Sequence, residues 1–109
     1  MEVTETKIFT YVGFAKKSRK LAIGSVAVGA AKKNVYLILL CGTASENTSK
    51  EASGYARKFS CPIVVCGSVL LSDLVLKENC KIAALLDKNL ATAILANISD
   101  GFNVVSGDN

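Results

Sequence analysis

Three short apolar runs dominate the pattern of hydrophobic and polar positions, at residues 36–41, 63–66 and 82–86. Each run is nearly continuous rather than alternating, and continuous runs indicate strands that are covered on both faces. Residues 19–21 predict a further short strand nearer the N-terminus. We therefore expect four strands, most of them buried.

Helical spacing occupies the segments between these strands. The clearest stripe follows an i, i+3, i+4, i+7 pattern and consists of Ala52, Tyr55, Ala56 and Phe59. Ser45 is a suitable N-cap for this helix, and Pro62 separates it from the next strand. Four other helices are predicted: one marked by Ile8, Val12 and Ala15, one from residues 24–25 to about 32, a short one over 70–76, and a last one capped by Asn89 that carries Leu90, Ile94 and Ile98 and stops at Gly101.

The alternation of helices and strands predicts an α/β protein. Its expected architecture is a three-layer α/β/α sandwich with a small four-stranded mixed sheet. The chain of 109 residues suits a single domain over residues 1–101, with residues 102–109 as a C-terminal tail.

The composition limits the remaining possibilities. Half of the residues are hydrophobic, which is enough for a core, but the longest apolar run, residues 35–41, is far below the ~20 residues that span a bilayer. The N-terminus shows no secretory signal, so we expect a cytoplasmic protein without a membrane partner. The four cysteines form no CxxC pair and there is no histidine, so we interpret the cysteines as small buried side chains and expect neither a metal nor a cofactor.

The charge is distributed unevenly along the chain. The net charge is only +4, but residues 6–45 contain no Asp or Glu. That segment carries Lys7, Lys16, Lys17, Arg19, Lys20, Lys32 and Lys33. A one-sided basic patch attracts polyanions, although lysines also solubilise an exposed face, and the pattern alone leaves both interpretations open.

The densest part of this patch lies just before the predicted second helix. Four of the five positions 16–20 are basic, and Gly24 and Ser25 follow at the expected helix start. A helix N-terminus presents unpaired N–H groups, and Gly24 would leave them accessible to a phosphate. The alternative is an ordinary Gly-Ser cap beside a solvated basic strand.

Four segments resemble a known family. They are "GFAKKSRKLAIGS", "VYLILLCGTASENTSK", "CPIVV" and "LVLKENCKIAALLDKNLATAI", and they lie within residues 7 to 95 without large insertions between them. In this order they resemble the kink-turn-binding ribosomal proteins (archaeal L-seven-Ae and L-thirty-e), and most closely the bacterial YlxQ branch. The resemblance implies an α/β/α sandwich that binds sharply bent RNA internal loops.

The resemblance also implies which residues contact RNA. Contacts from the start of the second helix fall on Gly24, Ser25 and Val28, flanking basic contacts on Lys16, Lys17, Arg19 and Lys20, and loop contacts near Val75, Leu76 and Lys77; Lys32 extends the basic patch. The chain departs from the family at Ser25, where a glutamate is usual. Losing that charged acceptor would cost ~1–3 kcal/mol of base discrimination. Ser72 and Leu76 replace glycines, so we expect a different loop shape there.

The leading hypothesis is a non-enzymatic, ribosome-associated protein that binds structured RNA as a monomer. The alternative is a protein-interaction or self-associating module on the same fold, using the Ala/Gly-rich second helix and the apolar segment 68–76. Catalysis is disfavoured, because histidine is absent and no paired carboxylates or phosphate-binding loop occur.

Overall fold

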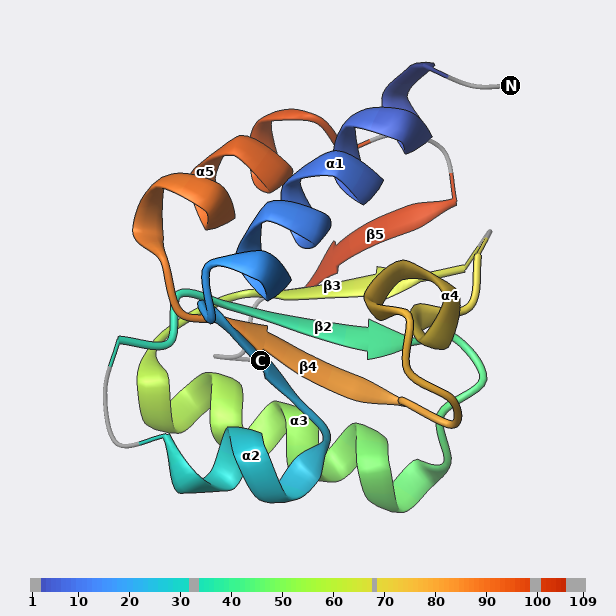
Figure 1. The fold of residues 1–109 in the computed structure, drawn as a ribbon. Helices are drawn as coiled ribbons and strands as arrows, with labels where there is room; N and C mark the ends of the chain where they lie inside the picture. Colours follow the sequence, from blue (N-terminus) through green and yellow to red (C-terminus); the bar gives the residue numbers. More distant parts are fainter. Residues whose placement is uncertain (1–2, 32–33, 68, 99–100, 106–109) are drawn as a thin grey trace.

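The computed structural model describes residues 3–31, 34–67, 69–98 and 101–105, with side chains from Lys7 onward. Helices and strands alternate along the chain (Figure 1). In order they are α1 (Val3–Lys17), β1 (Leu21–Ile23), α2 (Ser25–Ala30), β2 (Leu37–Cys41), α3 (Glu46–Phe59), β3 (Ile63–Cys66), α4 (Leu71–Val75), β4 (Ile82–Leu85), α5 (Lys88–Ala96) and β5 (Phe102–Val105).

The strands form one mixed five-stranded sheet in the order β1-β4-β2-β3-β5. The central pair, β2 and β3, is parallel, with Leu39 opposite Val64. The other three pairings are antiparallel: β2 with β4, β1 with β4, and β3 with β5. β1 and β5 are therefore the two edge strands.

Helices cover both faces of the sheet, as Figure 1 shows: α1, α4 and α5 lie on one face, and α2 and α3 on the other. Alternate residues of β2 pack into the cores on opposite faces of the sheet. Leu37 and Leu39 belong to the core cluster under α1, α4 and α5, whereas Ile38 and Leu40 belong to the cluster over α2 and α3. Every residue of β2 is buried, which is the reason its sequence is continuously apolar rather than alternating.

Local sequence signals explain most of the helix ends. The Ser45 hydroxyl accepts a hydrogen bond from the Thr48 N–H at 3.2 Å, which confirms the predicted N-cap of α3. Ser60 adopts a left-handed conformation and ends this helix before Pro62. The predicted Asn89 cap of α5 is wrong: the Asp87 side chain accepts from the Leu90 N–H at 2.9 Å, and the helix begins at Lys88.

The predicted sheet was one strand short. Residues 102–105, which the sequence predicts as part of a tail, form β5, which pairs with β3 and brings Phe102 into the core; residues 106–109 lie outside the described part of the chain. Gly101 leads into this strand, since α5 already ends at Ala96. Within the described residues, no helix is both long and apolar enough to cross a bilayer.

Candidate nucleic-acid interface

The cluster of cations at residues 16–20, here called the basic turn, is the C-terminal end of α1. The Ser18 and Lys20 N–H groups donate to the carbonyls of Phe14 (2.9 Å) and Ala15 (2.7 Å), and Arg19 takes a left-handed φ of 62°. This geometry caps the helix. The predicted strand start at residue 19 is therefore wrong: residues 18–20 cap α1, and β1 starts at Leu21.

All four cations of the basic turn are exposed. In the part of the chain that the structure describes, the side chains of Lys17, Arg19 and Lys20 make no hydrogen bond or ion pair with protein groups, so their charges are available to a partner. Cations at a helix C-terminus also interact favourably with the helix dipole.

Lys16 differs from its neighbours because it is engaged within the protein. Its Nζ donates to the Val75 carbonyl at 2.8 Å and to the Leu76 carbonyl at 3.2 Å. These carbonyls lie at the C-terminal end of α4, where helical acceptors have no partner of their own. The ammonium group therefore fastens the basic turn to the loop after α4, almost 60 residues later in the chain.

That loop presents an apolar side chain. Leu76 is 76% exposed and adopts φ 56°, the left-handed conformation that a glycine takes most easily. The Lys77 N–H donates to the Ser72 carbonyl at 3.1 Å and closes the turn. Leu76 thus occupies a backbone conformation typical of glycine while adding an exposed hydrophobic side chain, and Lys77 beside it is exposed as well.

Gly24 lies at the other end of β1 from the basic turn. It is the N-cap of α2, with φ 91° and ψ 160°, and its N–H donates to the Ile82 carbonyl at 2.9 Å. Apart from its two chain neighbours, no residue has an atom within 4 Å of the place a Cβ would occupy. Lys20 sits four residues earlier, where its carbonyl accepts from the Leu86 N–H. Strand geometry places the two residues ~13 Å apart. The basic turn and the helix start therefore border β1 from opposite ends.

Ser25 faces a carboxylate that the sequence pattern did not reveal. Its hydroxyl donates to Glu51 Oε1 of α3 at 3.0 Å, and the Tyr55 hydroxyl donates to the Ser25 carbonyl at 3.5 Å. Although residues 6–45 contain no Asp or Glu, a carboxylate from a later part of the chain therefore lies beside them in the folded protein. The packing of α3 against α2 places the Glu51 carboxylate next to the start of α2. Local sequence patterns do not predict this contact, because the two residues are 26 positions apart.

Two predicted contact residues are corrected by their burial. The side chains of Val28 and Val75 are both 0% exposed and belong to the two core clusters, so neither presents a side chain to a partner in this conformation. Val28 faces inward because α2 packs against the sheet through it. Val26, two residues earlier, is 88% exposed and is the apolar side chain that α2 does offer. Lys32 lies outside the described residues.

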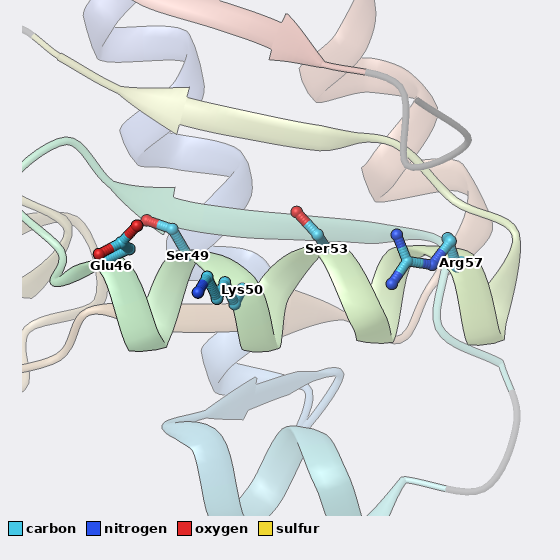
Figure 2. Close-up of a pocket in the computed structure, with 5 residues that line it drawn as sticks. All are labelled: Glu46, Ser49, Lys50, Ser53 and Arg57. Carbon is cyan, nitrogen blue, oxygen red and sulfur yellow. The ribbon is translucent and has the colours of Figure 1, made fainter.

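A separate shallow groove of ≈ 440 Å³ runs along α3, on the opposite face of the sheet from α1 (Figures 1 and 2). It is lined by Glu46, Ser49, Lys50, Ser53 and Arg57, all from this one helix. Figure 2 shows these polar side chains spread along the helix rather than converging on one point. None of the predicted contact residues that the structure describes lines this groove.

Comparisons with known proteins bear on the fold. No protein-family model matches the chain. No curated protein matches it either. Among solved structures, a protein of unknown function from Bacillus halodurans is similar with a TM-score of 0.68 and 22% sequence identity, over 84% of this chain and 95% of that one. At this identity the similarity establishes a shared mixed α/β fold over most of this chain and nearly the whole of the other.

Proposed function

We propose that this protein is a non-enzymatic, cytoplasmic RNA-binding protein, associated with ribosomes, that recognises a bent, kink-turn-like RNA. One observation carries the proposal: the two hydrogen bonds from Lys16 Nζ to the Val75 and Leu76 carbonyls. They join the basic turn to the loop around Leu76. The family resemblance assigns both segments to RNA contact, although they are far apart in the chain.

The chemistry of this surface suits a structured RNA. Lys17, Arg19 and Lys20 offer exposed cations for the phosphate backbone, while Leu76 offers an apolar contact for an unstacked base. Each neutralised phosphate releases counterions. With three to four such contacts, the logarithm of the association constant should fall with the logarithm of salt concentration at a slope of about −2 to −4.

Glu51 offers a replacement for the acid missing at position 25. It holds a carboxylate 3.0 Å from the Ser25 hydroxyl, beside the open backbone at Gly24. A carboxylate there can accept hydrogen bonds from a base edge, which is the role that the resemblance gives to a glutamate on α2 itself. We therefore assign base discrimination to Glu51 and phosphate contacts to the basic turn.

The affinity test uses a gel shift against a standard kink-turn RNA over a series of salt concentrations. Arg19→Ala and Lys20→Ala should each weaken binding severalfold and make the salt slope less steep by about one unit. Lys7→Ala is the matched control, because it removes an exposed cation from the other end of α1, ten residues or ~15 Å before Lys17. Equal effects of Lys20→Ala and Lys7→Ala, or an affinity independent of salt, would overturn the proposal.

A second experiment tests the carboxylate. Ser25→Glu alone would place two carboxylates side by side, so we expect it to gain little affinity. The double variant Ser25→Glu/Glu51→Gln moves the charge from α3 to α2 and should bind kink-turn RNA at least as tightly as the unmodified protein. Glu51→Gln alone should reduce discrimination against a kink-turn with altered G·A pairs. Unchanged discrimination would refute the role of Glu51.

Self-association is the competing function, and one observation favours it. β5 is an edge strand whose Val104 and Val105 are 49% and 43% exposed, and unpaired edges can add a strand from a second copy. The apolar segment 68–76 contributes less to such a surface than its sequence indicates, because Leu71, Leu74 and Val75 are core residues. Light scattering that gives a monomer mass at micromolar concentration would exclude this alternative.

A further inference from the structure

Three of the four cysteines lie together at one end of the sheet. Cys41 is the last residue of β2, Cys66 is the last residue of β3, and the two are register partners on these neighbouring parallel strands. Cys80 precedes β4, on the other side of β2. All three side chains are buried in the same core cluster, under α1, α4 and α5, and all are free thiols.

A polar network leads from the surface to Cys41. Lys81 Nζ donates to Thr43 Oγ1 at 2.9 Å, and Thr43 Oγ1 lies 3.2 Å from Cys41 Sγ. Because the Thr43 oxygen accepts from the ammonium group, its own proton is free to point at the sulfur. Thr43 is exposed and Lys81 is partly exposed, so this network connects the buried sulfur to solvent.

The environment of Cys41 favours the thiolate, in contrast to the other cysteines. Burial acts to raise the pKa of Cys41, but hydrogen bonds from the Thr43 side chain and from the backbone N–H groups of Leu71 and Thr43, together with the Lys81 charge, outweigh it and lower the pKa below 9.0. Burial instead raises the pKa of Cys61 to about 11 and that of Cys66 to about 12. Thiolates are the reactive form of cysteine.

We infer that Cys41 is a peroxide-reactive thiol whose oxidised form is resolved by Cys66 into an intramolecular disulfide. The juxtaposition supports the pairing, since adjacent strands lie ~4.8 Å apart and disulfides bridge Cα atoms separated by roughly 4.4–6.8 Å. The inference depends only on the arrangement of thiols, threonine and lysine, and it does not require RNA binding.

The chemistry uses hydrogen peroxide as the oxidant. The Cys41 thiolate attacks one peroxide oxygen, the O–O bond breaks, and the departing hydroxide takes a proton to become water, which leaves a sulfenic acid. The Cys66 thiolate then attacks the Cys41 sulfur. The S–S bond forms as the S–O bond breaks, and a second hydroxide leaves as water. Burial is the main cause of the raised pKa of Cys66 and persists through this step, whereas the smaller opposition from a charged Cys41 disappears once Cys41 is an uncharged sulfenic acid.

The test exposes the full-length protein to hydrogen peroxide at neutral pH, blocks the remaining thiols with an alkylating reagent, and locates the products by peptide mass spectrometry. We expect a Cys41–Cys66 disulfide, and we expect Cys66→Ser to accumulate a Cys41 sulfenic acid that dimedone traps. Cys61→Ser is the matched control, because Cys61 is buried in the cluster on the other face of the sheet, and it should oxidise like the unmodified protein.

A variant that keeps all four thiols tests the polar network. Thr43→Val removes the hydroxyl beside Cys41 at an exposed position, so the fold should survive, and the alkylation rate of Cys41 should fall severalfold because the side-chain hydrogen bond that helps to lower the Cys41 pKa is lost. An unchanged rate in this variant, or oxidation that begins at Cys61, would overturn the inference. A disulfide between Cys41 and Cys80 would overturn the choice of Cys66 as the resolving thiol.

Discussion

Replacing Gly24 by alanine tests how the start of α2 is built. The residue holds φ 91° and ψ 160°, a backbone region that is essentially restricted to glycine. Apart from its two chain neighbours, no residue has an atom within 4 Å of the added Cβ, so a clash with the surroundings contributes nothing and the cost is backbone strain alone. Such strain amounts to about 1–3 kcal/mol of unfolding free energy.

The assay is urea unfolding followed by circular dichroism. With a slope of about 2 kcal/mol per molar urea, a loss of ~2 kcal/mol lowers the unfolding midpoint by ~1 M. Gly54→Ala is the matched control, since Gly54 lies inside α3 with equally open space around it and without a positive φ. It should raise stability by about 0.5–1 kcal/mol. A Gly24→Ala midpoint equal to that of Gly54→Ala would refute the reasoning.

Three further predictions follow from packing and ionisation. Gly42→Ala should destabilise the protein by at least ~1–3 kcal/mol in the same assay, because the new Cβ would lie 2.7 Å from the Cys66 carbonyl oxygen; wild-type stability would contradict that contact. Val28→Ala should cost about 1.5–3 kcal/mol in urea unfolding and leave RNA affinity in a gel shift unchanged, as expected for a core residue. Because burial raises the folded-state pKa of Cys61 to about 11 and of Cys66 to about 12, the protein binds these protons more tightly than the unfolded chain. The resulting contribution to the free energy of unfolding is fully present below pH about 9 and is lost as pH rises through 11 to 12. With one of the two thiols removed, the urea midpoint of Cys61→Ala should fall less steeply with pH over this range than that of the unmodified protein. Identical slopes would argue against a raised pKa of Cys61.

The strands and helices that carry strong local signals could be predicted from the sequence. β2 and β3 are continuously apolar because both of their faces are covered, and the Ser45 cap acts within four residues of sequence. β5 was missed because its four residues have a weak pattern and only Phe102 is buried; pairing with β3, not local preference, makes it a strand.

The candidate interface also contains some features that the local sequence predicts and others that it does not. The basic turn is visible as a run of charges, and its exposure follows from its place at the end of a helix. Contacts between residues far apart in the sequence could not be predicted from local patterns. These are the contacts of Lys16 with the end of α4, of Glu51 with Ser25, and the pairing of Cys41 with Cys66 on neighbouring strands. The burial of the Val28 side chain could not be predicted, because position within a motif does not reveal which side of a six-residue helix faces the sheet.

The pairing of β1 with β4 has a consequence for the order in which the molecule assembles. β2, α3 and β3 are consecutive in the chain, so β2 and β3 can pair early in folding. The pairing of β1 with β4 instead joins Leu21 to Leu85, which are separated by more than half of the chain. Closing so long a loop is slow, and β1 cannot pair on a translating ribosome until β4 has emerged. Amide hydrogen exchange should therefore protect β2 and β3 most strongly, and the edge beside the basic turn should be the last region to become ordered and the first to open.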